Sequence, residues 1–180
     1  MANQISSPRG MRDFLPKEKL RREQILSEIL DVYRSRGFQS IETPAMENLE
    51  RLLSGQGGDN EKLAFQVLKR GEELDRAVDS GDGLADLGLR YDLTVPLTRF
   101  YASNQSQLPR VFKAVQTGPV WRAERPQKGR YRQFNQCDID ILGDSTIDAE
   151  LELLTASLEA LDRIGLTDAN IRILLPPPRR

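Results

Sequence analysis

The sequence predicts an α+β domain in which an antiparallel sheet is flanked by helices. Three observations lead to this fold class: an amphipathic helical pattern near the N-terminus, two extended runs joined by a loop with Pro and Gly, and a second amphipathic pattern near the C-terminus. The chain has 180 residues, which is enough for one domain with a core and too few for two domains of ordinary size.

The first helix is predicted over residues 17–36, after an irregular lead-in of residues 1–16. Its apolar residues recur every three or four positions, at Ile25, Leu26, Ile29, Leu30, Val32 and Tyr33. Gly37 favours a helix end at that point. A short strand is expected over residues 38–44, because its β-branched content and its closing Pro44 suit a sheet edge or an interface.

Residues 53–87 contain two turn-rich segments, SGQGGDN and DSGDG, on either side of the more ordered LAFQVLKR. We expect a loop, a short strand or hairpin, and another loop in this region. The next run, LGLRYDLTVPLTRFYA, predicts a strand through Thr94. A short helix is expected after Pro96, since proline is accepted in the first helical turn.

Two further extended runs, VFKAVQTGPVWRAE and RYRQFNQCDIDILG, predict an antiparallel hairpin. The last helix is predicted to begin at a capping box of Ser145 and Asp148 and to end at Gly165. Its apolar stripe consists of Ile147, Leu151, Leu154, Leu158 and Leu161. After this helix, DANIRI resembles the opening of another strand, whereas the final LLPPPRR cannot continue a sheet.

The composition excludes several classes of protein. With 38% hydrophobic residues, 29% charged residues and a mean hydropathy of −0.51, the chain falls in the range of soluble globular domains. Its apolar runs are far shorter than the roughly 20 residues that cross a bilayer, and the N-terminus has no signal-peptide pattern, so a cytoplasmic location is expected. The single cysteine, Cys137, excludes an intrachain disulfide, and the absence of histidine removes the usual base of Ser/His/Asp sites.

Positive charge is concentrated in one stretch, although the net charge of the chain is only −1. Positions 110–132 contain seven basic residues and one acid, Glu124, which gives a local charge of +6. The basic residues are Arg110, Lys113, Arg122, Arg125, Lys128, Arg130 and Arg132. This stretch suits contact with anions, and a solvated basic loop is the alternative interpretation.

Alternation along the expected strands predicts a shared polar floor, because residues two apart face the same way. In the second hairpin strand the polar face carries Arg130, Arg132, Phe134, Gln136, Asp138 and Asp140. The opposite, apolar face carries Cys137, Ile139 and Ile141. The same parity groups Val120, Arg122 and Glu124, and separately Arg90, Asp92 and Thr94. Arginines at one end and carboxylates at the other suit a ligand such as an aminoacyl-nucleotide, although an ordinary solvated strand face is the alternative for the acids.

Other residues on these runs have simpler expected roles. Tyr91, Trp121 and Tyr131 are expected to be packing or edge residues. Cys137 is expected to be a small buried hydrophobic residue rather than a nucleophile.

The run GPVWRAERPQKGRYRQFNQCDIDILG closely resembles motif 2 of class II aminoacyl-tRNA synthetases, in the form found in histidyl-tRNA synthetases. RGMRDFLP and RYDLTVPLTRF resemble the N-terminal and substrate-binding segments of that family, and GFQSIETPAMENLE is similar to its motif 1 region. The resemblance covers residues 8–173, with motif 1 at about 18–50 and motif 2 at about 118–143. It implies a histidine–tRNA ligase, which activates histidine with ATP and its bound Mg²⁺ to histidyl-adenylate and transfers it to tRNA(His).

The resemblance also implies a role for individual residues. Arg122 is expected to be the catalytic arginine that bridges the ATP α-phosphate and the histidine carboxylate. The other expected ATP-binding residues are Glu124 at the adenine amino group, Phe134 on the adenine ring, and Arg130 at the nucleotide or carboxylate. The expected histidine-binding residues are Asp92 and Thr94 at the α-amino group, Asp140 at the imidazole, and Gln136 beside them. No metal-ligating residue is expected.

On this resemblance, residues 1–175 form the N-terminal part of a class II catalytic domain, truncated before motif 3, and residues 176–180 form an irregular tail. No counterpart of the anticodon-binding domain is expected. The family forms a homodimer through its motif 1 surface, where Pro44 would be the motif's proline. Two alternatives stay open: a non-catalytic relative such as the histidine-sensing regulatory subunit of ATP phosphoribosyltransferase, and a dimerising or tRNA-binding module without ligand chemistry.

Overall fold

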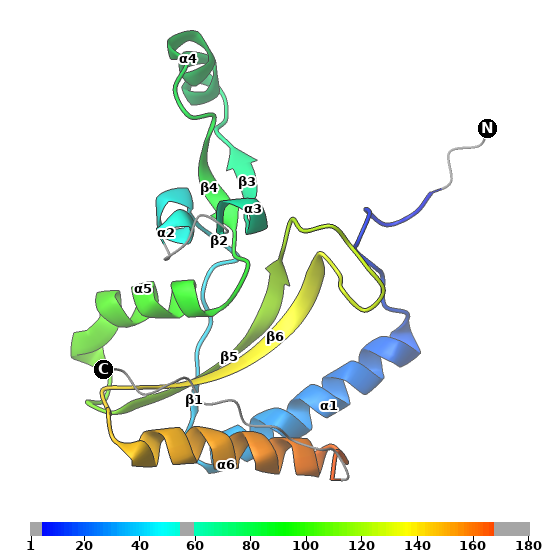
Figure 1. The fold of residues 1–180 in the computed structure, drawn as a ribbon, viewed down its shortest axis with the longest axis vertical. Helices are drawn as coiled ribbons and strands as arrows, with labels where there is room; N and C mark the ends of the chain where they lie inside the picture. The colour runs from blue at the N-terminus through cyan, green and yellow to red at the C-terminus, as the bar shows by residue number, and fades with distance from the viewer. Residues whose placement is uncertain (1–4, 55–59, 168–180) are drawn as a thin grey trace.

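The larger structural unit of the chain is a three-stranded sheet, sheet A, with the strand order β1-β5-β6 (Figure 1). The computed structural model describes residues 5–54 and 60–167. In sheet A, β5 (Phe112–Trp121) pairs antiparallel with β6 (Gln133–Leu142) along ten residues, and this is the predicted hairpin. The short β1 (Gln39–Ser40) pairs parallel with β5 and forms one edge of the sheet, as its sequence indicated.

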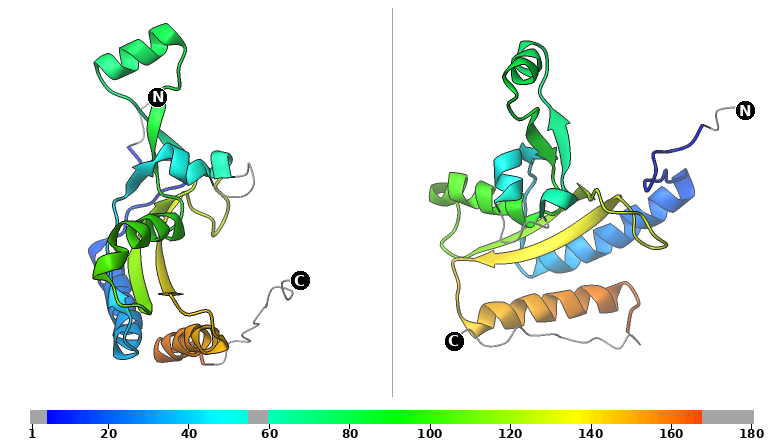
Figure 2. Two further views of the ribbon diagram at one scale, coloured as in Figure 1. Left: turned by 90° about the vertical axis from the view of Figure 1, so that its left-hand side faces the viewer. Right: turned by 45° about the horizontal axis from the view of Figure 1, so that its top comes forward.

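Helices α1 (Pro16–Ser35) and α6 (Ile147–Arg163) cover one face of sheet A, side by side (Figures 1 and 2). Both helices were predicted from their periodicity. The apolar face of β6 packs against them, as strand alternation required, in a cluster of Val32, Tyr33, Phe38, Val115, Cys137, Ile139, Ile141, Leu153, Ala156 and Ala160. At the margin of this core, Arg36 donates to Glu159 at 2.7 Å and to Glu152 at 3.2 Å, which ties the end of α1 to α6.

The buried side of α6 is not the predicted leucine stripe. Its buried residues are Ala149, Ala156 and Ala160, while Ile147 and Leu151 are 73% and 57% exposed. Small side chains face the core because α1 packs closely against this side of α6. The predicted capping box is also absent: the N-cap residue is Thr146, and its backbone N–H donates to Asp144 Oδ1 at 2.9 Å.

Sheet B is a second, antiparallel sheet with the order β2-β4-β3. It consists of β2 (Met46–Asn48), β3 (Phe65–Leu68) and β4 (Ala85–Leu89), with the short helices α2 (Leu49–Leu53) and α3 (Asn60–Leu63) beside it. The β3–β4 hairpin projects away from sheet A, and α4 (Glu72–Ser80) forms its tip (Figures 1 and 2). The sequence predicted only loops around β3, because glycines at positive φ, Gly71 and Gly81, flank this short helix and dominate its local pattern.

The strand predicted through Thr94 ends earlier, at Leu89. Helix α5 (Thr94–Asn104) then begins two residues before Pro96 and continues into a 3₁₀ turn, η1 (Gln105–Gln107). The intervening residues form a turn because Asp92 Oδ1 accepts the backbone N–H of Val95 at 3.2 Å, which satisfies a free donor of the first helical turn.

Two expectations fall on parts of the chain outside this description. The strand expected at DANIRI and the proline-rich tail belong to residues 168–180, and most of the SGQGGDN loop belongs to residues 55–59. Within residues 5–54 and 60–167, every helix is too short or too polar to pass through a bilayer.

Replacing Gly143 with Ala is expected to destabilise the chain by about 3 kcal/mol. Gly143 has φ +87° and closes the turn after β6, where a Cβ would overlap the carbonyl oxygen of Arg110. Gly37 is a matched control, because it has φ +83° and a Cβ there would meet no other described atom within 4 Å. Gly37→Ala should therefore cost only the left-handed backbone strain, about 1 kcal/mol. Urea unfolding measures both values, and equal losses would contradict the steric argument.

Candidate functional site

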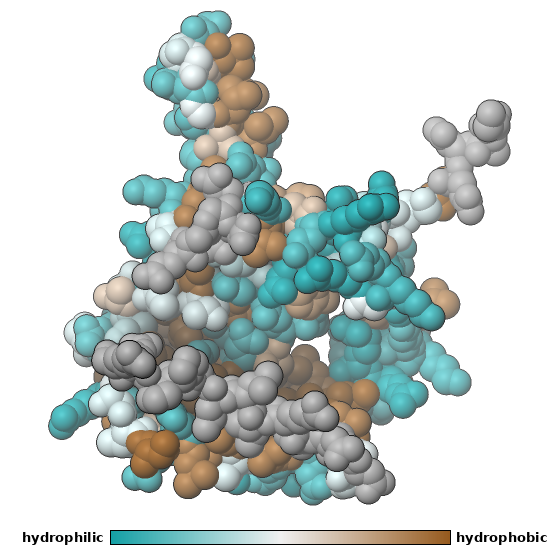
Figure 3. All heavy atoms as spheres, in the orientation of Figure 1, coloured by the Kyte–Doolittle hydropathy of each residue, from teal (hydrophilic) through white to brown (hydrophobic). Residues whose placement is uncertain are grey.

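The nucleotide-binding residues expected from the sequence lie around one small cavity at the end of the β5–β6 hairpin where the loop joins the two strands. The cavity has a volume of about 230 Å³ and is lined by Arg122, Glu124, Gly129, Arg130, Tyr131 and Phe134. Arg122 directly follows β5 and Phe134 lies on β6, so strand pairing brings them together. Hydrophilic side chains gather over this end of the hairpin (Figure 3). All four residues expected to contact ATP therefore share a single hollow, and their role as ligands stays a prediction.

Backbone and ring contacts fix the position of Arg122. Its backbone N–H donates to the carbonyl oxygen of Arg132 at 2.8 Å, and its Nε donates to the carbonyl oxygen of Tyr91 at 3.1 Å. The guanidinium carbon lies 5.0 Å from the centre of the Phe134 ring, within the range of a cation–π contact. Among the described residues, the two terminal nitrogens of this guanidinium donate no hydrogen bond, so they are available to an anion.

The loop between β5 and β6 is held in shape by contacts among its own residues. Glu124 forms an ion pair with Arg130 at 3.2 Å, and its carbonyl oxygen accepts a hydrogen bond from Arg132 Nε at 3.0 Å. Gly129 adopts φ +79°, which allows the turn between Gln127 and Arg130. Tyr131, expected to be a packing or edge residue, is 40% exposed and also lines the cavity. Its position between two arginines of the basic run was the signal that could have identified it.

Asp138 lies within electrostatic reach of Arg122 and of two further carboxylates, Asp140 and Asp92. Burial raises the pKa of Asp138 and of Asp140. The pKa of Asp138 is raised further by the charges of Asp140 and Asp92 and lowered by Arg122. The second strand of the hairpin and the turn before α5 therefore meet at one place. An excess of acid beside a fixed arginine suits a ligand that carries both a cationic group and an anionic group.

Gln136 lies on the same face of β6 as Asp138 and Asp140. Its Oε1 is buried, and no described residue donates a hydrogen bond to it. Because a buried acceptor without a donor costs about 1–3 kcal/mol, this oxygen has a physical reason to bind a ligand N–H. Thr94, by contrast, is exposed at the first position of α5.

The polar floor predicted from three strands is wrong in two respects. First, β4 belongs to sheet B, so only the hairpin and the turn after Leu89 meet at the site. Second, Arg90 is buried rather than open to a ligand, with its guanidinium bound to the carbonyl oxygens of Thr43 at 2.7 Å and Pro119 at 3.1 Å. Backbone geometry outside regular strands caused both errors, since alternation applies only while the chain stays extended.

Several other residues of the expected polar floor also lie elsewhere. Val120 is fully buried in the core. Arg132 precedes β6, and its guanidinium lies 5.9 Å from the Phe65 ring.

The backbone N–H of Trp121 donates to the carbonyl oxygen of Arg90 at 3.0 Å. This hydrogen bond joins the end of β5 to sheet B and brings the turn before α5 to Arg122.

Cys137 has no place in this site. It packs in the core under sheet A, and burial raises the pKa of its thiol to about 11. The thiol is therefore protonated at neutral pH, which agrees with the expected role of a small hydrophobic residue.

Replacing Asp140 with Asn is expected to increase the free energy of unfolding near pH 7 and to leave it unchanged well below pH 3.8. Because burial raises the pKa of the folded-state carboxyl above 3.8, the wild-type chain loses stability as the pH rises through that folded-state pKa. The uncharged amide avoids this loss. Urea unfolding at several pH values measures the difference.

Asp144 is a control of opposite sign for the Asp140 experiment. The backbone N–H of Thr146 lowers the pKa of the Asp144 carboxyl, so its contribution is present above pH 3.8 and lost as the pH falls through its folded-state pKa. Asp144→Asn should therefore decrease stability near pH 7. If Asp140→Asn changed stability in the same direction as Asp144→Asn, burial of the Asp140 charge would not be the dominant effect.

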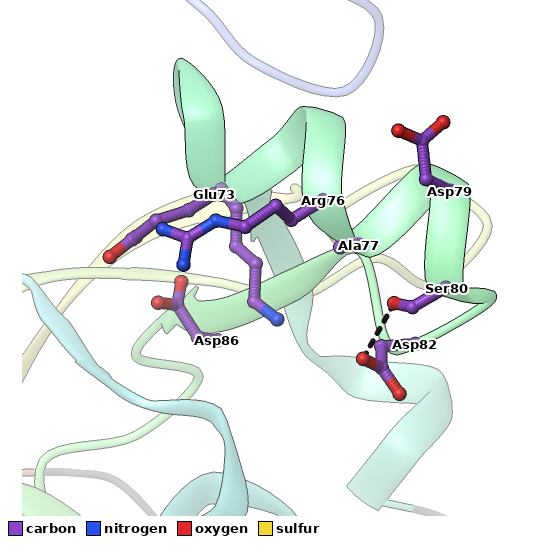
Figure 4. A pocket seen from close by; sticks show the side chains of 8 residues that line it. Glu73, Arg76, Ala77, Asp79, Ser80, Asp82 and Asp86 are labelled. Carbon is purple, nitrogen blue, oxygen red and sulfur yellow. Dashed lines mark hydrogen bonds between the residues drawn. The ribbon is translucent and has the colours of Figure 1, made fainter.

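A larger hollow lies elsewhere, between α4 and the β3–β4 hairpin, and has a volume of about 760 Å³ (Figure 4). Four acids and two bases are among the residues that line it, and Ser80 Oγ donates to Asp82 Oδ2 at 2.6 Å. It contains none of the expected site residues. Its size alone does not make it the functional site, because neither an unpartnered buried polar atom nor an aromatic platform lines it.

Comparison with known proteins gives a consistent assignment. A family model described as "Histidyl-tRNA synthetase" matches residues 10–176. A histidine–tRNA ligase from Leifsonia xyli subsp. xyli (strain CTCB07) is 58% identical over 178 residues, which cover 96% of this chain and 41% of that relative. The chain thus spans about two fifths of the length of these curated relatives.

Solved structures support the same fold. Histidyl-tRNA synthetase from Nostoc sp. PCC 7120 is 33% identical with a TM-score of 0.66, and the match covers 88% of this chain and 34% of that chain. A structure described as an ATP phosphoribosyltransferase regulatory subunit/histidyl-tRNA synthetase, from Bacillus halodurans C, is 25% identical with a TM-score of 0.75. That match covers 93% of this chain and 40% of the other. The α+β class predicted from the sequence is therefore confirmed.

Proposed function

Because this chain belongs to the histidyl-tRNA synthetase family, we propose that it supplies the nucleotide-binding part and much of the histidine-binding part of a histidine–tRNA ligase. The proposed reaction is the ATP-dependent activation of histidine to histidyl-adenylate, followed by transfer of histidine to tRNA(His). The observation that carries the proposal is the single cavity that Arg122 shares with Glu124, Arg130 and Phe134, beside three carboxylates.

In the proposed activation step, Arg122 bridges the α-phosphate of ATP and the carboxylate of histidine. A carboxylate oxygen attacks the α-phosphorus, the bond to the bridging oxygen of the β-phosphate breaks, and pyrophosphate leaves. Negative charge grows on the α-phosphate oxygens in the transition state, and a guanidinium held in place stabilises it. The hydrogen bond from Nε to Tyr91 orients the guanidinium before substrate binds.

The adenine end of the nucleotide lies on Phe134 in this proposal. The half-buried ring lines the cavity and offers a stacking surface, and the Glu124 carboxylate accepts a hydrogen bond from the adenine amino group. Arg130 then faces the nucleotide or the substrate carboxylate. Since Glu124 and Arg130 form an ion pair 3.2 Å apart in the free chain, binding exchanges this pair for contacts to the ligand.

The histidine end lies over the acids. Asp92 and Thr94 receive the α-amino group, Asp140 accepts from the imidazole, and Gln136 contributes its buried Oε1 as an acceptor. A carboxylate partner favours the protonated imidazole and orients it. The uncompensated burial of Asp140 in the free chain supports this role, since a cationic ligand would relieve it.

Mg²⁺ is expected to arrive bound to the phosphates of ATP. Within residues 5–54 and 60–167, no group of three acidic, cysteine or histidine side chains could hold a metal ion.

A non-catalytic, histidine-sensing relative is the second candidate, because one structural neighbour is described as an ATP phosphoribosyltransferase regulatory subunit/histidyl-tRNA synthetase. A sensor of histidine needs the acids but no adenine platform. The basic run around the cavity, with Phe134 under the guanidinium of Arg122, favours nucleotide chemistry instead.

Calorimetric titration with a non-hydrolysable histidyl-adenylate analogue tests the proposal, with the leucyl analogue and free histidine as comparison ligands. Selective binding of the histidyl analogue, lost in Arg122→Ala and in Asp140→Ala, is the expected result. Equal affinity for free histidine and for the analogue would favour the sensor. Failure of all three ligands to bind would contradict a formed site in this chain.

The larger assembly follows from the same proposal. Residues 1–175 form part of a class II catalytic domain that acts in the cytoplasm as a homodimer through the motif 1 surface around Pro44. A chain that sediments as a monomer at high concentration would contradict the dimer.

A further inference from the structure

The lead-in to α1 is attached to the loop that lines the proposed nucleotide cavity. The backbone N–H of Arg132 donates to the carbonyl oxygen of Gly10 at 2.7 Å. Arg132 in turn accepts the backbone N–H of Arg122 at 2.8 Å. Two consecutive short hydrogen bonds therefore connect a segment near the N-terminus to the arginine proposed for catalysis.

At Gly10 the lead-in lies so close to the loop that no side chain fits. Gly10 adopts φ +82°, and a Cβ would lie 2.9 Å from Cγ of Arg132 and 3.0 Å from Cβ of Pro126. The turn that presents Gly10 is closed by the N–H of Met11, which donates to the carbonyl oxygen of Pro8 at 2.9 Å. The lead-in thus passes close to Pro126 and Arg132, at opposite ends of this part of the loop, and leaves no space there for a side chain at position 10.

Stacked side chains continue the contact on the cavity side. The Arg12 guanidinium lies 4.5 Å from the centre of the Phe14 ring and 5.6 Å from that of Tyr131. Arg22, on α1, stacks on Phe14 at 4.1 Å, and Arg12 also pairs with Glu18. Tyr131 lines the cavity, so this series of stacked groups runs from the first turns of α1 to the cavity wall.

We propose that the lead-in strap, defined as residues 7–14, positions the β5–β6 loop for the nucleotide, and that Gly10 and Arg12 are positioning residues for Arg122 and Tyr131. The inference rests on the proposed function for the identity of the ligand. The effect of the strap on the position of the loop can be tested without any ligand. Neither residue contacts the nucleotide in this proposal; both act by holding the loop in its binding geometry.

The test combines hydrogen exchange of residues 122–134 in the free chain with calorimetric affinity for the histidyl-adenylate analogue. Gly10→Ala should accelerate amide hydrogen exchange at Arg122 and Arg132. It should also lower the affinity for the analogue by about tenfold or more. Gly81→Ala is the matched control, because Gly81 also has a positive φ of +73° but a Cβ there would meet no described atom within 4 Å. Gly81→Ala should leave both measurements unchanged.

A second variant covers the case in which Gly10→Ala fails to fold. Arg12→Gln removes the cation between Phe14 and Tyr131 at an exposed position, and Lys19→Gln, which removes an exposed ion pair on α1, is its control. Arg12→Gln should also accelerate loop exchange, and Arg12→Lys should restore it in part. If the strap variants exchange and bind like their controls, the proposal is overturned. If the wild-type chain fails to bind the analogue, the proposed function is contradicted. The hydrogen-exchange data alone then decide whether the strap positions the loop.

Discussion

Arg122→Ala is expected to weaken binding of the histidyl-adenylate analogue by about a hundredfold, because at least two charge-assisted hydrogen bonds of about 1.5 kcal/mol each are lost. The backbone of Arg122 is held by Arg132 and its Nε by the carbonyl of Tyr91, so the guanidinium needs little reordering to bind. Arg122→Lys keeps the charge and loses the planar fork, and it should fall between wild type and Arg122→Ala. Isothermal titration calorimetry measures all three affinities.

Arg125 is the matched control for that experiment. It lies on the same loop, is exposed and does not line the cavity. Arg125→Ala should change affinity for the analogue by less than about threefold, since an exposed charge contributes little. A loss at position 125 as large as the loss at 122 would show that general positive charge, rather than the placed guanidinium, binds the ligand.

Arg90→Ala is expected to lower the free energy of unfolding by about 4 kcal/mol. The Arg90 side chain is nearly inaccessible and donates to the carbonyl oxygens of Thr43, Pro44 and Pro119. Truncation leaves these acceptors buried without donors and opens a cavity between the two sheets. Urea unfolding followed by circular dichroism measures the loss.

The control for Arg90 is an arginine with weak partners. Arg34 is largely exposed, lies 3.8 Å from Asp31 and donates to Ser40 Oγ at 3.4 Å. Arg34→Ala should change stability by no more than about 0.5 kcal/mol. A loss below about 1 kcal/mol for Arg90→Ala would contradict its role in joining the sheets.

The parts of the fold that the sequence predicted are those with strong local periodicity. Helix α1 and the β5–β6 hairpin have repeats that depend only on their own residues. The orientation of α6 was not predictable from its leucines, because a neighbouring helix selected Ala156 and Ala160 for the contact instead. Helix α4 was missed because its nine residues carry little periodic signal between two glycines.

In the candidate site, too, some residue positions could be predicted from the sequence and others could not. Arg122, Glu124 and Phe134 could be placed together from hairpin pairing alone. The burial of Arg90 was not predictable, because its partners are backbone carbonyls at positions 43, 44 and 119, which reveal nothing through their side chains. The cation–π contact of Tyr131 with Arg12 was likewise not predictable, because the two residues lie far apart in the sequence.

Trp121 gives the chain a built-in optical reporter. It is the one tryptophan in the sequence, it precedes Arg122, and its indole N–H donates to Gln133 Oε1 at 3.2 Å across the hairpin. Its backbone also joins the two sheets through Arg90. Intrinsic fluorescence at this position should therefore respond to ligand at Arg122 and to separation of the sheets, and the emission of the whole chain on tryptophan excitation comes from that one junction.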